Sequence, residues 1–411
     1  MSETVSEIVA AHLSGAATPE QTIRRCYERI RAYDDPAVFI TLREEAQALA
    51  EARALMAAGL EGKPLFGVPV AVKDNIDVAG LPTTAACPAF AYDASADATA
   101  VAQLRRAGAI VIGKTNLDQF ATGLVGVRSP YGVPRNPFRD DLIPGGSSSG
   151  SAAAVAAGLV PISLGTDTAG SGRVPAGLNN IVGLKPSLGL ISTAGVVPAC
   201  RSLDCVSVFA LTVDDAFAAL QVMGVPDASD PFSRAMPLGR LSAAPHAMVI
   251  AVPDANGRIF FGDTRSEQSF ETAIALLRNM GAEIREIDVS ALLETARLLY
   301  EGPWVAERYA AVGAFIERNP DAAHPVTRQI ILGGGKLSAA DTFRSFYRLA
   351  ALKRKALEIF SGIDALMVPT VPAAYTVAQL EADPIALNSN LGTYTNFVNL
   401  LDLCGLAVPV S

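Results

Sequence analysis

Histidine is scarce in this chain, and the shortage limits the chemistry that its serines can perform. The 411 residues include only His12, His246 and His324, and none of them lies near a serine-rich turn. The serine-rich stretches also lack the G-x-S-x-G elbow that presents a nucleophilic serine to a histidine base. We interpret the three histidines as structural or surface residues. A serine site that depends on histidine is therefore excluded.

Disulfides and membrane-spanning segments are missing as well. The five cysteines are an odd number without a C-x-x-C pair, which argues against a disulfide framework and favours reduced, buried thiols. The N-terminus is acidic where a secretory signal would be basic. No apolar run reaches the roughly 20 residues that span a bilayer. We therefore expect a soluble, cytoplasmic protein.

Positive charge is also in deficit, since the net charge is −8. This argues against nucleic acid or an anionic membrane as the main partner, although a single arginine can still bind a small anion. A nucleotide- or anion-binding module built on the Gly/Ser turns is one alternative. It lacks the lysine of G-x-x-x-x-G-K-[ST], and no G-x-G-x-x-G follows a strand. We expect neither a metal nor a cofactor.

Half of the residues are hydrophobic, which favours a large packed core. Residues 1–60 have helical patterns and form a predicted N-terminal helical region. Over 61–411, helices alternate with apolar strands, which predicts an α/β domain with polar turns at the strand ends. A Pro-, Ser- and Asp-rich segment at 225–245 resembles a boundary or long surface loop.

The second half of the chain has its own pattern. Residues 246–289 predict a strand, a helix and a strand in a βαβ-like unit. Helices are expected near 291–318 and 338–361, followed by a strand at 364–372. The segment 395–411 predicts a helix that runs into an apolar strand. Because that strand stops abruptly at Ser411, we expect a longer protein whose C-terminal domain is missing here.

Glycine, serine and threonine crowd two stretches, 145–151 and 165–172, which an alanine-rich segment joins. Such turns supply hydroxyls and free backbone N–H groups. A third motif, AVKDN, puts Lys73 at the end of an apolar run. If Lys73 is buried, desolvation lowers its pKa and favours the neutral amine that accepts a proton; the alternative is a lysine that points into solvent. Together these groups indicate acyl transfer by a serine enzyme.

These motifs resemble the amidase signature family. GGSSSGSAAAVAAG, LGTDTAGSGRVPA, GLKPS and AVKDN follow in the family's order, from about Gly67 to Leu211, with a weaker match to the end. The resemblance implies the amidase signature fold, an α/β architecture whose central, mixed, mostly parallel β-sheet is covered on both sides by α-helices. It also implies that Lys73 is the base, Ser147 the relay serine after a cis Gly146–Ser147 bond, and Ser171 the nucleophile.

The same resemblance lets us expect roles for the residues around the triad. The predicted oxyanion donors are the backbone N–H groups of Thr168, Ala169, Gly170 and Ser171. Asp167 and Arg173 flank this turn, and we expect them to hold its shape. Ser148, Ser149 and Ser151 are interpreted as turn formers and caps of the following helix.

The substrate is suggested by a narrower resemblance. Family members that transfer ammonia to charged tRNA usually carry Gly-Gly-Ser-Ile, whereas this chain has TAGSGRVPA at 168–176. That turn, LYEGPWVAERYAA and the segment 386–409 are similar to the allophanate-hydrolysing branch of the family. Allophanate is urea with an N-carboxylate, so it is small, planar and anionic. Such a substrate needs a cation and hydrogen-bond donors.

Tyr300 and Arg308 lie eight residues apart on what the pattern predicts as one helix, and so on similar faces. The resemblance implies that Arg308 faces the substrate carboxylate, that Tyr300 donates to the urea end, and that Gly123 supplies a backbone contact. An ordinary amphipathic helix with a solvated arginine is the alternative.

The implied reaction is hydrolysis of allophanate to ammonia and N-carboxycarbamate through an acyl-enzyme, in urea or s-triazine nitrogen catabolism. A broad-specificity amidase and the amidase subunit of a tRNA-dependent amidotransferase are the alternatives within the family. We expect a homodimer, and a urea- or biuret-processing enzyme upstream.

Overall fold

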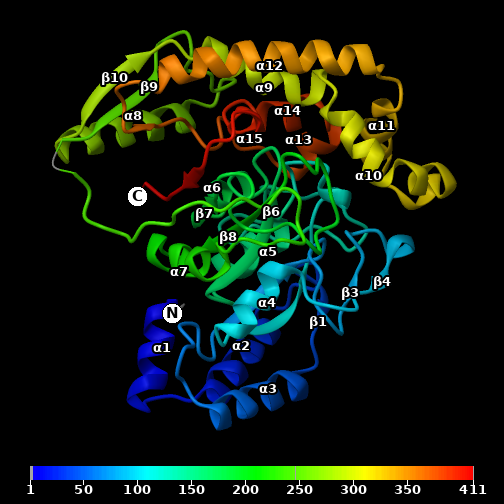
Figure 1. The fold of residues 1–411 in the computed structure, drawn as a ribbon, viewed down its shortest axis with the longest axis vertical. Coiled ribbons are helices and arrows are strands. Elements are labelled where there is room, and N and C mark those ends of the chain that lie inside the picture. The colour runs from blue at the N-terminus through cyan, green and yellow to red at the C-terminus, as the bar shows by residue number, and fades with distance from the viewer. Residues whose placement is uncertain (1–2, 246, 411) are drawn as a thin grey trace.

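A seven-stranded sheet forms the centre of the computed structural model, which describes residues 3–245 and 247–410 (Figure 1). The strand order is β1-β5-β2-β6-β8-β7-β12. These strands are β1 (Phe39–Leu42), β2 (Pro69–Lys73), β5 (Ile110–Thr115), β6 (Ile162–Asp167), β7 (Val182–Lys185), β8 (Cys205–Ala210) and β12 (Gly405–Ala407). His246 and Ser411, on which parts of two predictions fell, lie outside the described residues.

The strand directions make the sheet mixed. The β5–β2 and β2–β6 pairs are parallel, and the other neighbouring pairs are antiparallel. It follows that β5, β2, β6 and β7 point one way, while β1, β8 and β12 point the other way. The predicted mixed α/β sheet is confirmed, and four of its seven strands run in the same direction.

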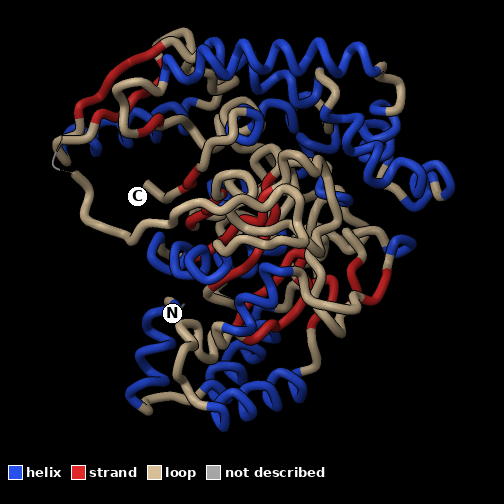
Figure 2. Tube along the Cα trace, viewed as in Figure 1, coloured by secondary structure: helices blue, strands red, loops and turns tan. Residues whose placement is uncertain are grey.

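Helices of the first half cover this sheet, and those of the second half build a further layer (Figures 1 and 2). The first group comprises α1 (Val5–Ser14), α2 (Pro19–Tyr33), α3 (Glu45–Ala58), α4 (Thr99–Arg106), α5 (Ser149–Ala156), α6 (Val174–Leu178) and α7 (Val213–Met223). The second comprises α8 (Thr264–Asn279), α9 (Ser290–Glu301), α10 (Trp304–Arg318), α11 (Pro325–Gly334), α12 (Ala339–Ile359), α13 (Val377–Ala382), α14 (Ala386–Leu391) and α15 (Asn396–Leu400).

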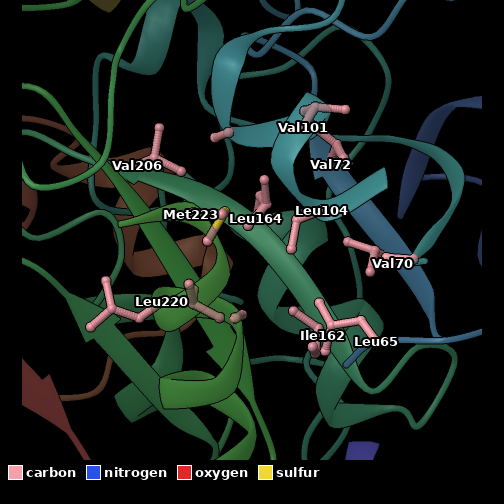
Figure 3. Packing of buried hydrophobic residues seen from close by; sticks show 14 of the residues in the cluster. Leu65, Val70, Val72, Val101, Leu104, Ile162, Leu164, Val206, Leu220 and Met223 are labelled. Carbon is pink, nitrogen blue, oxygen red and sulfur yellow. The ribbon is translucent and has the colours of Figure 1, made fainter. Parts of the chain in front are cut away.

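Both faces of the sheet are buried, because successive side chains of each strand enter different apolar clusters. Val70 and Val72 of β2 pack in one cluster with Leu104 of α4 and Leu220 of α7, as Figure 3 shows. Ala71, between those two valines, packs in the other cluster with residues of α2, α3 and α5. The predicted cover of helices on both sides is therefore confirmed.

The N-terminal region contains the expected helices and one strand that the sequence analysis did not predict. Thr18 caps α2 in a capping box, with Pro19 at the first helical position. The unpredicted strand is β1, which pairs antiparallel with β5 at the edge of the central sheet. It has only four residues, and its pairing with β5 is long-range, so local pattern is a weak guide to it.

A second sheet carries the predicted βαβ unit. Its order is β10 (Glu283–Ile287), β9 (Val249–Pro253) and β11 (Ala365–Leu366), and β9 and β10 are parallel across α8. The strand expected over 364–372 is only two residues long, because Pro369 and Pro372 cannot donate to a ladder. A separate two-stranded ladder pairs β3 (Pro82–Thr83) with β4 (Tyr92–Asp93).

The C-terminal part of the chain returns to the central sheet. Between α7 and β9, the described residues 224–245 and 247–248 contain no helix or strand, and they include the predicted loop at 225–245. Much later α15 packs beside α9, and β12 pairs antiparallel with β7 at the sheet edge. Within the described residues, no helix is both long and apolar enough to cross a membrane.

Candidate active site

Lys73 is fully buried at the end of β2, so the alternative of a solvent-exposed lysine is wrong. Its Nζ is hydrogen-bonded to Ser147 Oγ at 2.7 Å and to Thr166 Oγ1 at 2.8 Å. Thr166 lies on β6, the parallel neighbour of β2, so both side chains come from the same end of the sheet. Burial lowers the pKa of Lys73 to about 7, against the opposing charges of Asp118 and Asp167. The lysine is therefore poised between its two protonation states at neutral pH.

Ser147 follows the cis Gly146–Ser147 peptide bond that the resemblance implies. Its carbonyl accepts the N–H groups of Asp118 and Ser149, each at 3.0 Å. A Cβ on Gly146 would lie 2.1 Å from Asp118 Oδ2, so a glycine is required there for close packing. These contacts hold the Ser147 hydroxyl against Lys73.

The neighbouring serines do not cap α5 with their side chains, which corrects that part of the prediction. Ser148 is the N-cap residue, but its hydroxyl accepts no N–H of the helix and instead donates to the Thr166 carbonyl. Ser151 donates to the Leu164 carbonyl at 2.8 Å. The hydroxyls therefore join α5 to β6, because their buried neighbours offer carbonyl acceptors.

Ser171 lies on the turn that follows β6, and Asp167 organises this turn as predicted. One carboxylate oxygen of Asp167 accepts from Gly170 N at 2.9 Å and the other from Gly172 N at 3.0 Å. Both oxygens also accept from the Arg173 guanidinium. Burial alone would raise the pKa of Asp167, but the Arg173 charge and these hydrogen bonds hold it below its usual value.

The predicted oxyanion donors are not equivalent in this turn. The Gly170 N–H is engaged by Asp167, so it is not free to bind an oxyanion. The N–H groups of Thr168, Ala169 and Ser171 make no hydrogen bond with any residue in the described part of the chain. The Thr168 hydroxyl donates to Asp204 Oδ1. Three of the four predicted donors thus remain available to a ligand.

Among the described residues, the Ser171 hydroxyl has one hydrogen-bond partner, the carbonyl of Gly123, at 3.4 Å. Among the hydrogen bonds of residues 3–245 and 247–410, none joins Ser171 to Ser147. Gly123 is tightly enclosed, since a Cβ there would lie 2.6 Å from Asp118 Oδ2 and 3.2 Å from Arg128 Nη1. The Gly123 backbone, for which we predicted a contact with the substrate, therefore lies beside the Ser171 hydroxyl.

Tyr300 and Arg308 lie on two helices, not on the single helix that was predicted. Tyr300 is near the end of α9 and Arg308 is in α10, because Gly302 and Pro303 interrupt the helix between them. The two side chains still meet, with Arg308 Cζ 5.9 Å from the Tyr300 ring centroid. The break therefore lets a side chain of α10 pack against a side chain of α9.

Arg308 is 2% exposed, so the alternative of a solvated arginine is wrong. Its Nη1 donates to Thr122 Oγ1 at 3.1 Å and to the Ala121 carbonyl at 3.3 Å. No carboxylate of the described residues forms an ion pair with it. A buried guanidinium without a carboxylate partner is suited to bind an anionic ligand.

Some residues of the site were not predicted from the sequence. Asp118 accepts from the N–H groups of Val125, Gly126 and Arg128, and so shapes the loop that carries Gly123. Thr166 and Asp204 were also missed. The available signal for Asp118 was its position three residues after the buried strand β5, since polar residues that follow strand ends line sites in α/β sheets.

Neither of the described histidines, His12 and His324, contributes a functional group to this site. His12 bridges the Phe66 carbonyl and the Thr22 hydroxyl, each at 2.9 Å, and His324 precedes α11. No group of three or more His, Cys, Asp or Glu residues in the part of the chain that the structure describes could hold a metal ion. The chemical groups assembled here are a lysine, two serines, free N–H groups and an arginine.

Comparisons with known proteins identify the family to which this chain is similar. The protein-family model described as Amidase matches residues 21–411. Urea amidolyase of Lachancea kluyveri is 50% identical over 403 residues, which are 96% of this chain and 22% of that protein. The chain thus spans about a fifth of the length of the urea amidolyases it matches.

Two further relatives match nearly all of this chain. A solved structure of Kluyveromyces lactis allophanate hydrolase superposes with a TM-score of 0.93 at 46% identity, covering 99% of this chain and 67% of that one. A glutamyl-tRNA(Gln) amidotransferase of Streptococcus pneumoniae has a subunit that is 33% identical, over 98% of this chain and 87% of that protein. The similarity is therefore higher to enzymes of urea and allophanate than to the amidotransferase.

Proposed function

This chain belongs to the amidase signature family, and from that premise we propose that it hydrolyses allophanate to ammonia and N-carboxycarbamate. The observation that carries the proposal is Arg308, a buried cation without a carboxylate partner among the described residues, beside the serine–lysine cluster. An amidase for neutral substrates has no need of such a cation. Allophanate offers a carboxylate for Arg308 and an amide for Ser171 within one small molecule.

In the proposed mechanism, Ser171 Oγ attacks the amide carbonyl carbon. Its proton passes to Ser147 Oγ as the Ser147 proton passes to neutral Lys73 Nζ. The relay then returns a proton to the departing nitrogen, the C–N bond breaks, and ammonia leaves an acyl-Ser171 ester. Water attacks this ester, gives its proton to the same relay and releases the product with the Ser171 hydroxyl restored.

Stabilisation of the oxyanion falls to the turn after β6. The N–H groups of Thr168, Ala169 and Ser171 are free of internal acceptors in the described chain, and so can donate to the charge that develops on the carbonyl oxygen. Asp167 holds the turn in this shape through Gly170 and Gly172. Gly170 therefore serves the turn's geometry rather than the oxyanion itself.

For the substrate we propose that Arg308 binds the carboxylate and that the Tyr300 hydroxyl donates to the urea end. Gly123 completes the pocket with its backbone beside Ser171. Because Arg308 Nη1 is already used by Ala121 and Thr122, the substrate takes the remaining donors of the guanidinium.

The experiment is a measurement of ammonia release from allophanate, biuret, malonamide and glutamine, without metal or nucleotide. We expect allophanate to be preferred, and Ser171→Ala to abolish its turnover because no nucleophile remains. Ser233→Ala, which removes a hydroxyl in the loop after α7, is the control and should leave turnover intact. A preference for glutamine would favour the amidotransferase role, and a broad profile would favour a general amidase; either result contradicts the proposal.

Arg308→Lys supplies the second half of this test. Lysine keeps the charge but loses the planar fork, so kcat/KM should fall at least about tenfold for allophanate and less for neutral malonamide. Equal losses on both substrates would remove Arg308 from the carboxylate site.

The remaining expectations about the whole protein stay proposals. We propose that residues 1–60, which are mostly helical and contribute β1 to the central sheet, precede the main body of an amidase domain at 61–411, that a further C-terminal domain belongs to the full-length enzyme, and that the protein is a cytoplasmic homodimer. An enzyme that forms allophanate from urea, biuret or s-triazine breakdown would act upstream of it. Size-exclusion chromatography with light scattering tests the dimer.

A further inference from the structure

Asp204 is a buried carboxylate to which the proposed mechanism gives no task. It accepts the Thr168 hydroxyl, the Ala199 N–H at 2.9 Å and the Cys200 N–H at 3.1 Å. It forms no ion pair with any residue of the described ranges. Burial raises its pKa to about 6, which its three donors oppose. The carboxylate thus binds the oxyanion turn, through Thr168, to the loop formed by residues 199–204.

The other side of this 199–204 loop is bound to helix α10. Ser202 donates its N–H and its hydroxyl to the two carboxylate oxygens of Glu307, each at 2.7 Å. The Cys200 thiol also donates to the Trp304 carbonyl, at the first residue of α10. Glu307 is the neighbour in sequence of Arg308. The loop therefore contacts the oxyanion turn at one end and the helix that carries Arg308 at the other.

We propose that Asp204 and Glu307 are positioning residues that hold the oxyanion turn and Arg308 at a fixed separation. The proposal rests on the function proposed above, in which one small substrate touches both places at once. A rigid, planar substrate cannot adapt to a change in that separation, and a misplacement of about 1 Å can cost about 100-fold in rate. The Asp204 end acts on the turn, and the Glu307 end acts on the arginine.

The Asp204 end predicts coupling with Thr168. In Asp204→Asn, one of the two carboxylate oxygens becomes an NH₂ group, which cannot accept a hydrogen bond. The remaining oxygen cannot accept from the Thr168 hydroxyl and from both backbone N–H groups of the loop. In Thr168→Val, the hydroxyl is lost at nearly constant volume. Each variant should lower kcat about 10- to 100-fold with either allophanate or malonamide, because both substrates use the oxyanion turn. The double variant should be no slower than the slower single variant.

The Glu307 end predicts a change in selectivity. Glu307→Gln loses one of its two acceptors for Ser202 and loosens the start of α10. The ratio of kcat/KM for allophanate to that for malonamide should then fall about tenfold, because malonamide carries no carboxylate for Arg308. Glu317→Gln is the matched control on the same helix, since its carboxylate bonds the Tyr309 hydroxyl at the surface; the ratio should keep its wild-type value.

Asp215→Asn is the control for loss of a buried carboxylate, in α7. Thermal unfolding is measured for every variant; if Asp204→Asn does not fold, Thr168→Val, which keeps the backbone bonds of the loop, carries the kcat test.

Additive losses in the double variant, unchanged kcat in Thr168→Val, or a wild-type ratio in Glu307→Gln would overturn the proposal. If the wild-type enzyme ignores allophanate, the proposed function fails, while the Thr168–Asp204 cycle measured with malonamide still tests the positioning role.

Discussion

At the scale of single residues, the protonation of Lys73 controls the proposed chemistry. A lysine in water is almost entirely protonated at neutral pH and cannot accept a proton. Here burial lowers the pKa of Lys73 to about 7 without an ion pair in the described part of the chain. The depressed pKa also costs stability, because the folded protein binds this proton less tightly than the unfolded chain does. The cost is present in full below about pH 7 and is lost as the pH rises from about 7 to 10.5.

This residue predicts the acid limb of the pH profile. The neutral amine is the active form, so kcat/KM for malonamide should fall as the pH drops through about 7 and should level off above about 8. Malonamide is chosen because it does not ionise in this range. Lys73→Met should be inactive at every pH, with a loss of at least about 100-fold. A wild-type profile that is flat between about pH 5.5 and 8.5 would contradict the assignment of Lys73 as the base.

At the scale of elements, the turn after β6 depends on the buried Asp167–Arg173 pair. Arg173 also donates to the Thr395 carbonyl and to Asn399 Oδ1, so it joins this turn to the region of α15. Asp167 and Arg173 side chains are 0% and 5% exposed. Removing one partner from such a pair leaves the other charge buried without compensation.

Arg173→Met should therefore lower the free energy of unfolding by about 3–5 kcal/mol, measured by urea denaturation. Asp167→Asn in the same chain should recover part of this loss, because the uncompensated charge is gone. The matched control is Arg234→Met, which breaks the exposed Arg234–Asp402 pair and should cost less than about 1 kcal/mol. Equal effects of the two arginine substitutions would show that the turn does not depend on the buried pair.

At the scale of the whole molecule, the two halves of the chain share one core. The second half contributes β12 to the edge of the central sheet, and residues of α9 and α15 pack in a cluster with Val174 of α6. The loop between α7 and β9 connects the halves, and residues 239–245 of this loop are exposed. A break in this loop should therefore leave the shared core intact.

Brief treatment with trypsin should cut first after the exposed Arg240, giving fragments 1–240 and 241–411 that stay associated and active. Size-exclusion chromatography and the ammonia assay measure the outcome. Arg240→Gln is the control and should slow the cleavage at this site. Separation of the fragments without denaturant would mean that the contacts between the halves are too weak to hold them together.

Several features could be predicted from the sequence because their signals are local. The alternation of helices and strands, the βαβ unit and the turns around Ser147 and Ser171 follow from short-range pattern. The end of β2 at Lys73 belongs to the same class. The break at Gly302 and Pro303 also has a local signal, because a glycine and a proline interrupt the helical pattern between α9 and α10.

The amino-acid sequence alone sets the inventory of this protein: a histidine-free set of serines and one lysine after an apolar strand, placed on turns at strand ends. How these groups are used is settled in three dimensions. The fold buries Lys73 beside Thr166, joins Arg173 to Asn399, and brings Arg308 to Thr122. The physical reason is that burial and hydrogen-bond competition depend on neighbours far along the chain, and no local pattern encodes them.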